Sequence, residues 1–266
     1  MSTVTGRIAE IKQPWGGYLR RKQFDEVLFQ DGKGLYDENI HASVIGMAVE
    51  YLTRYLTGSS VEEAFEVSIQ GYLCREKLVD QKAIKRDKKR KMDIYSLCKK
   101  IKGLDDESVI AACQAVTYDM WYRNAMAAFF ATDAFGTKPN WGTIRNIQIM
   151  VERCLAFWKL YGPVLKTGFT FENEGYSKVV DAGDGDFLTK DTLWDFQVSK
   201  RKPTSKKTLQ VLMYWIMGQH SGKKEFREIT KIGIFNPRLN VAYIIETKKI
   251  PIEIINIVEN DIICYE

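Results

Sequence analysis

The sequence has few of the residues that build metal sites from nitrogen and sulfur. It has two histidines, His41 and His220, and five cysteines that stand singly, without a Cys-x-x-Cys pair. A structural zinc site needs four such ligands, usually in closely spaced pairs, so we expect no zinc centre. An odd number of scattered cysteines also gives no disulfide framework and is typical of a reducing compartment.

Long hydrophobic runs are missing as well. No stretch approaches the roughly 18 consecutive apolar residues of a membrane-spanning helix. The first residues, MSTVTGRIAEIKQ, are polar and charged, unlike a signal peptide. With 266 residues, of which 45% are hydrophobic and 27% charged, the chain can bury a substantial core. We therefore expect a soluble, cytoplasmic protein without a membrane partner.

The net charge of +5 is mild, but positive charge is unevenly distributed. Residues 82–102 contain ten Lys or Arg against two Asp, and residues 200–207 contain five with no acid. Lys85, Arg86 and Lys89 lie close together on a helical wheel, where they could bind the phosphates of a nucleic acid. A solvated helix face is the alternative interpretation.

Helical patterns dominate the first part of the chain. Apolar residues recur at spacings of three and four, and Ser60 with Glu63 has the spacing of a capping box. The first 38 residues predict an irregular or hairpin-bearing leader. An aromatic stretch at 118–130 predicts helical core, with stacking on bases as the alternative. Helices are expected from about 45 to 58, 60 to 74, 80 to 101, 105 to 130 and 143 to 161.

After Pro163 the pattern changes to short, strand-like segments separated by Gly or Asp turns. The predicted fold class is α/β, more closely an α+β fold with a mixed sheet. A mainly helical portion, residues 1–162, precedes a strand-rich portion, residues 163–266, and the two could form one compact unit. Strands are expected at 169–171, 176–181, 185–188, 193–198, 231–235 and 241–245, with a helix at 205–217.

Two aspartates stand nine residues apart in the strand-rich portion. Asp186 follows a Gly-rich turn, and Asp195 lies in a strand between apolar neighbours. A buried carboxylate is strongly destabilising unless it is paired or binds a cation. Two of them on adjacent strands predict an oxygen-rich site for Mg²⁺ or Mn²⁺. Phosphodiester hydrolysis is a reaction that needs such a cation.

Side chains that follow Asp195 are predicted to face it. Alternation along the strand places Gln197 on the same face as Asp195. Helical spacing places Lys207, Gln210 and Tyr214 on one face of the next helix, with Lys206 nearly as well placed. The alternative interpretation is a solvated basic turn followed by an ordinary polar helix face.

In this order and spacing, the fragments resemble the RecB-like branch of the PD-(D/E)XK nuclease superfamily. The resemblance extends roughly from Gly175 to Glu246 and includes Gly-Asp-Gly-Asp at 183–186, Asp-Phe-Gln at 195–197 and Gln-x-x-x-Tyr at 210–214. It implies a restriction-endonuclease-like core of αβββαβ order with a helical N-terminal portion. It also implies metal-dependent hydrolysis of DNA, with double or single strands left open.

The resemblance also implies the metal ligands. Asp186, Asp195 and the main-chain carbonyl of Phe196 would hold Mg²⁺ or Mn²⁺, and Asp184 could replace Asp186. Glu50, four residues after a glycine, stands where the family has a further ligand. For Glu50, the alternative is an i,i+4 ion pair with Arg54.

The remaining roles concern the water and the DNA. Gln197 stands where the family has a lysine, so Gln197 or Lys207 would position the attacking water. Gln210, Tyr214 and Lys206 would face the active site or the nucleic acid.

The departure at Gln197 leaves a second function open. A neutral Gln cannot act as a base, so the alternative is an inactive module that binds nucleic acid or protein. A structural protein with a chance resemblance is a third interpretation. Because the sequence has no Gly-x-x-x-x-Gly-Lys-Ser/Thr motif, a helicase or recombination partner would be a separate chain.

Overall fold

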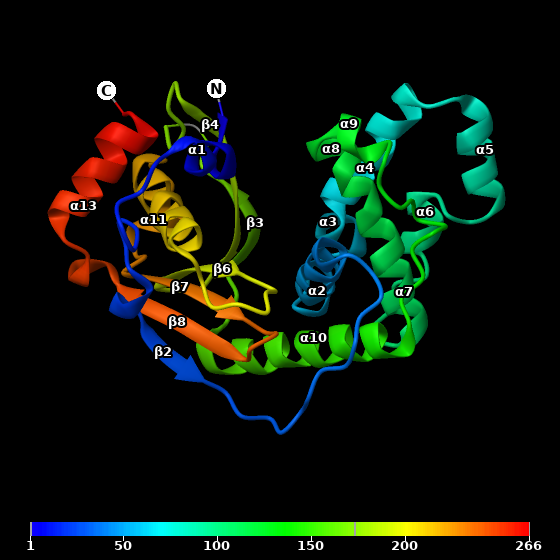
Figure 1. Cartoon of the computed structure of the whole chain (residues 1–266), viewed down its shortest axis with the longest axis horizontal. Coiled ribbons are helices and arrows are strands. Elements are labelled where there is room, and N and C mark those ends of the chain that lie inside the picture. Colours follow the sequence, from blue (N-terminus) through cyan, green and yellow to red (C-terminus); the bar gives the residue numbers. More distant parts are fainter. Residues whose placement is uncertain (1, 173, 266) are drawn as a thin grey trace. The chain divides into compact units, whose positions relative to one another are not determined.

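The computed structural model describes residues 2–172 and 174–265 and separates into two compact units (Figure 1). One unit combines residues 1–30 with residues 157–266, and the other consists of residues 31–156. These bounds differ from the division at residue 162 that the sequence suggests. The reason is that the first residues supply two strands and a helix to the C-terminal unit, where the sequence predicts an irregular or hairpin-bearing leader.

The first unit, which we call the sheet unit, contains all the strands of the described residues. Most expected strands and the helix after them are confirmed within a few residues; 176–181 shrinks to the short β4. Its elements are β1 (Ser2–Thr3), α1 (Val4–Glu10), η1 (Arg21–Gln23), β2 (Asp25–Leu28), β3 (Lys166–Thr170), β4 (Val180–Ala182), β5 (Asp184–Leu188), β6 (Thr192–Phe196), α11 (Ser205–His220), α12 (Lys224–Arg227), β7 (Lys231–Asn236), β8 (Val241–Glu246), η3 (Thr247–Lys249), α13 (Ile252–Ile257) and η4 (Val258–Ile263).

Six strands form one mixed sheet in the order β2-β8-β7-β6-β5-β3. Neighbours are antiparallel except β6 and β7, which run parallel. A parallel neighbour needs a crossover connection, and α11 lies in that connection between β6 and β7. The fold is therefore a mixed α/β arrangement, as the sequence predicts.

The two faces of this sheet have different neighbours. Trp194 and Phe196 point to one face, where their rings contact Phe157 and Trp158 at the end of α10 (Trp141–Tyr161). Residues between them point to the other face, which α11 covers with its buried apolar side chains. Because strand side chains alternate, Asp195 is directed toward α11.

The second unit, the helical unit, begins with a helix whose apolar stripe is buried as predicted. Ile45, Val49 and Leu52 are fully buried, and Gly58 follows the helix end with a positive φ of 118°. Its helices are α2 (Ala42–Leu56), α3 (Val61–Ala64), α4 (Glu66–Leu78), α5 (Gln81–Lys89), α6 (Ile94–Cys98), α7 (Asp106–Ala115), η2 (Val116–Tyr118), α8 (Asp119–Arg123), α9 (Ala125–Ala128) and most of α10.

Several helices of this unit are shorter than the sequence suggests. The capping box of Ser60 and Glu63 is present, but its helix breaks at Phe65. The single basic helix expected at 80–101 is wrong, because the chain turns at Lys91, which has a positive φ of 53°. Asp93 then accepts a hydrogen bond from the amide of Ser96 and starts a separate helix, α6.

The aromatic stretch also differs from the expectation of helical core. Tyr118 is buried, but Tyr122, Phe129 and Phe130 are 58%, 54% and 89% exposed. The helix there breaks at Asn124, so these rings cannot share one buried stripe. Among the described residues, no helix is long and apolar enough to cross a membrane.

Candidate functional site

The register of β5 and β6 places the two predicted carboxylates opposite each other. Phe187 pairs with Trp194 and Leu188 pairs with Leu193, so the next step of the antiparallel register sets Asp186 opposite Asp195. Opposed residues share a face of the sheet, and this face carries α11. The sequence-based expectation that both aspartates lie on neighbouring strands is confirmed.

Asp195 is 2% exposed, and only one of its two carboxylate oxygens has a hydrogen-bond partner. Its Oδ1 atom lies 3.4 Å from Nε2 of Gln210. Its Oδ2 atom is buried and accepts no hydrogen bond from any described residue; the ammonium of Lys207 lies 3.8 Å away, beyond hydrogen-bond length. Burial raises the pKa of the Asp195 carboxyl, the Lys207 ammonium opposes that rise, and the like charge of Asp184 adds to it.

Asp186 is fixed against the neighbouring strand. Its Oδ2 atom accepts a hydrogen bond of 2.6 Å from the main-chain N–H of Phe196. This bond holds the carboxyl group of Asp186 beside the end of β6. The Phe196 ring points to the opposite face, where it stacks on Trp158 at 5.4 Å, so only the main chain of Phe196 can contribute to the site.

Asp184 is a third aspartate on the same face of the sheet as Asp186 and Asp195. It is two residues before Asp186 on β5 and therefore shares its face. Its negative charge raises the pKa of Asp195. The sequence carries a signal for this position, since Asp184 belongs to the same Gly-Asp-Gly-Asp segment and is the alternative to Asp186 there.

Gln197 follows β6 directly and is held by its backbone, whose N–H donates to the carbonyl of Phe235 at 2.9 Å. Its side-chain Oε1 is buried and, like Asp195 Oδ2, accepts no hydrogen bond from the described residues. The two residues are separated by one position and so share a face. Two buried oxygen acceptors without a donor among the described residues therefore lie on the same face.

The first turns of α11 bring a polar network to the same carboxylates. Lys207 Nζ donates to Gln210 Oε1 at 3.0 Å, and Gln210 Nε2 donates to the hydroxyl of Tyr214 at 2.9 Å. Burial and the nearby carboxylates of β5 and β6 raise the pKa of Tyr214 well above its ordinary value, so its hydroxyl stays neutral. Lys206 is exposed one position away.

The position of Lys207 is unfavourable for the helix itself. It stands in the first turn of α11, which has no acidic residue, and a cation near a helix N-terminus opposes the helix dipole. The compensation is the carboxylate of Asp195.

Four predicted site residues lie in the helical unit. The carboxylate of Glu50 forms the alternative i,i+4 ion pair with Arg54 on α2. Lys85, Arg86 and Lys89 are exposed on α5, as expected for a solvated or phosphate-binding face.

The residues present offer oxygen ligands, but few carboxylates, to a small cation. Among the described residues, no group of three or more His, Cys, Asp or Glu side chains is arranged to hold a metal ion. The fit rests on two carboxylates that share a face and on the buried, donor-free oxygens of Asp195 and Gln197. Carboxylate and amide oxygens are ligands that Mg²⁺ and Mn²⁺ accept, with water completing the shell.

Comparison with known proteins assigns no family to the chain. No family model matches the chain, and no significant match was found among curated proteins or solved structures.

Proposed function

We propose that this protein is a metal-dependent deoxyribonuclease of the PD-(D/E)XK type, similar to RecB-like nucleases. The observation that carries the proposal is the buried carboxylate of Asp195, opposite Asp186, with an oxygen that accepts no hydrogen bond from the described residues. The Lys207 ammonium, 3.8 Å away, offsets the burial of this carboxylate only in part, since the pKa of Asp195 is still raised. A function that binds a cation accounts for its presence.

The order of elements supports the proposal. A helix (α10), three antiparallel strands (β3, β5 and β6), a crossover helix (α11) and a parallel strand (β7) follow one another, apart from the short β4 and the short α12. This is the αβββαβ order that the resemblance implies. β8 and β2 extend the sheet beyond β7.

In this proposal, Asp186, Asp195 and the Phe196 carbonyl hold Mg²⁺ or Mn²⁺, with Gln197 Oε1 beside them. When bound, such a cation polarises a phosphate and lowers the pKa of a water molecule.

The chain's own residues position the reactants. The Lys207 ammonium stabilises negative charge that develops on the phosphate. Gln210 fixes both Lys207 and Asp195, and the neutral hydroxyl of Tyr214 accepts a hydrogen bond from Gln210 in the same network. Gln197 positions water through its amide and cannot take up a proton.

Cleavage assays test the proposal. Linear and circular DNA, single- and double-stranded, are incubated with the full-length protein in Mg²⁺, in Mn²⁺ and in EDTA. We expect cleavage that requires the cation and is lost in Asp195→Asn. Asp191→Asn is the matched control, because that aspartate pairs with Lys231 on the same sheet without belonging to the site. Cleavage that persists in Asp195→Asn would contradict the proposal.

A catalytically inactive nucleic-acid-binding module is the second candidate. The neutral Gln197 favours it, because the family's lysine is missing from this strand. The same assays separate the two functions, since the module would bind DNA in EDTA and leave it intact in Mn²⁺.

A further inference from the structure

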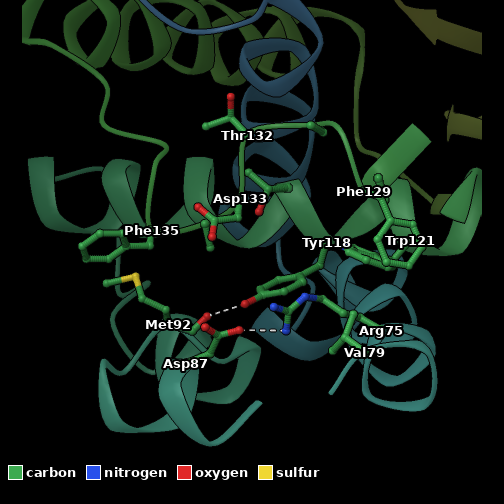
Figure 2. A pocket seen from close by; sticks show the side chains of 14 residues that line it. Arg75, Val79, Asp87, Met92, Tyr118, Trp121, Phe129, Thr132, Asp133 and Phe135 are labelled. Atoms are coloured by element: carbon green, nitrogen blue, oxygen red, sulfur yellow. Dashed lines mark hydrogen bonds and ion pairs between the residues drawn. The ribbon is translucent and has the colours of Figure 1, made fainter. Parts of the chain in front are cut away.

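The helical unit contains a cavity of about 430 Å³ that the proposed nuclease site does not use (Figure 2). Its lining comes from α4, α5, the segment around α8 and α9, and the loop at 131–135. The volume lies within the range of about 300–1,000 Å³ that small-molecule sites have. It is large enough for a single planar ring system.

A fixed polar group forms one side of this cavity. Arg75 Nη1 lies 2.7 Å from Asp87 Oδ2, and both residues are at least nine-tenths buried. The guanidinium of Arg75 also lies 5.6 Å from the centre of the Trp121 ring. Figure 2 shows this ion pair beside Tyr118, whose hydroxyl donates to the Met92 carbonyl at 2.7 Å. The polar side is therefore held in place before any ligand arrives.

Aromatic rings form the other walls. Trp121 and Phe129 make an edge-to-face contact with centroids 4.7 Å apart, and Phe135 lies on the far side in Figure 2. Phe129 and Phe135 are 54% and 43% exposed, so much of their apolar surface faces water. Exposed apolar surface that adjoins a cavity is typical of a ligand site.

Positive charge adjoins these rings. Residues 81–91 contain seven Lys or Arg and one acid, and that acid is the buried Asp87. Arg86 Nε lies 3.8 Å from Asp87 Oδ1, and the guanidinium of Arg90 lies 4.2 Å from the centre of the Phe135 ring. Two arginines of the basic segment are therefore close to the lining of the cavity.

We propose that the cavity holds an unstacked base of single-stranded DNA, whose neighbouring phosphates bind Arg86 and Arg90. Aromatic rings stack on bases regardless of sequence, while an adjacent basic groove binds the backbone. An apolar protein segment would not need the cations, so charge complementarity favours the nucleic acid. The inference rests on the proposed function for the identity of the polymer, and it names the single strand as the substrate form.

Binding in EDTA tests this without any contribution from catalysis. Fluorescence anisotropy of a labelled oligo(dT) reports affinity for the full-length protein, with a duplex of equal length as comparison. We expect oligo(dT) to bind at least tenfold more tightly than the duplex. Phe129→Ala should weaken oligo(dT) binding about five- to hundredfold, the range of one lost stacking contact. Phe130→Ala is the matched control, because Phe130 is 89% exposed but does not line the cavity.

The salt dependence of binding tests the contacts between the arginines and the DNA phosphates separately. Arg86→Gln should reduce the slope of log Kd against log salt by about 0.7, the value for one phosphate contact in a single strand. Lys99→Gln, an exposed cation outside the cavity lining, should leave that slope unchanged. Free dTMP should compete with oligo(dT) only at concentrations at least a hundredfold higher.

Four outcomes would overturn the inference: absent DNA binding, equal affinity for duplex and oligo(dT), equal loss in Phe129→Ala and Phe130→Ala, or dTMP competing as well as the oligonucleotide. The last result would assign a free-nucleotide site. Circular dichroism of Phe129→Ala confirms that the variant is folded. Failure of the nuclease proposal looks different, because it abolishes Mn²⁺-dependent cleavage while oligo(dT) binding and its dependence on Phe129 remain.

Discussion

Lys207, in the first turn of α11, places its ammonium nitrogen 3.8 Å from the buried Oδ2 of Asp195 on β6. The two residues come from opposite sides of the β6–α11 connection. In the family that we propose for this chain, a lysine stands two residues after the corresponding aspartate, where this chain has Gln197. A lysine from the helix therefore supplies positive charge where the strand does not.

Lys207→Gln is expected to separate cation binding from cleavage. Since Lys207 stabilises charge on the phosphate in our proposal, its loss should slow cleavage about 100-fold or more. Binding of Mn²⁺ should be retained, because the carboxylates remain. Single-turnover cleavage and Mn²⁺ titration measure the two effects. Lys224→Gln, an exposed cation of the same unit, is the control; equal rates for both variants would rule out this role.

Asp195→Asn is expected to stabilise the protein when no cation is present. The folded-state pKa of Asp195 is raised, so its stabilising contribution is present at low pH and is lost as the pH rises and the carboxyl ionises. At neutral pH the uncharged Asn should therefore raise Tm by a few degrees, roughly the effect of 1 kcal/mol in a protein of this size. Thermal unfolding in EDTA measures this. A lower Tm for the variant would show that the carboxylate is already satisfied.

Gln197→Glu tests the second buried oxygen. If Gln197 Oε1 faces the cation, a carboxylate there should tighten Mn²⁺ binding about tenfold, because affinity for hard cations rises with ligand charge. Without a cation, the variant should be less stable, since its new charge lies near Asp184 and Asp195. Calorimetric titration measures the affinity. Unchanged or weaker binding would remove Gln197 from the site.

Asp119 in the helical unit gives a pH-dependent prediction that is independent of the nuclease proposal. Burial raises the pKa of its carboxyl to about 6, although Ser68 and Tyr51 donate hydrogen bonds to it. Its favourable contribution is complete below the unfolded-state value near 4 and is lost as the pH rises through about 6.

The measurement compares wild type with Asp119→Asn by urea unfolding at pH 4 and pH 7.5. Between these values, the variant should gain about 2 kcal/mol relative to wild type, at about 1.4 kcal/mol for each pKa unit, because a small part of the effect is already lost at pH 4. A difference that stays constant with pH would show that Asp119 titrates normally.

Local patterns predicted most of the sheet unit. The alternation around Asp195 and the spacing of Lys207, Gln210 and Tyr214 predicted which residues share a face, because strand and helix periodicity are local properties. The hydrogen bond from Phe196 N–H to Asp186 was not predictable, since it depends on the cross-strand register. That register is set by packing of the whole strand pair.

Other features could not be predicted from the sequence because they depend on contacts between distant residues or on a local helix break. β2 is a four-residue edge strand whose partner, β8, lies more than 200 residues away, so no local signal marks it. The exposure of Phe129 and Phe130 follows from the helix break at Asn124, which periodicity alone does not predict. One signal was available: a single acid, Asp87, among the cations of the basic segment indicated a buried ion pair.

Calorimetric titration of Mn²⁺ into the metal-free protein tests the central claim most directly. We predict that the wild type and the Asp191→Asn control bind Mn²⁺ with the same affinity, while Asp186→Asn and Asp195→Asn each lose at least a factor of ten. A wild type that binds no Mn²⁺, or an Asp195→Asn variant that binds it equally well, would contradict the account.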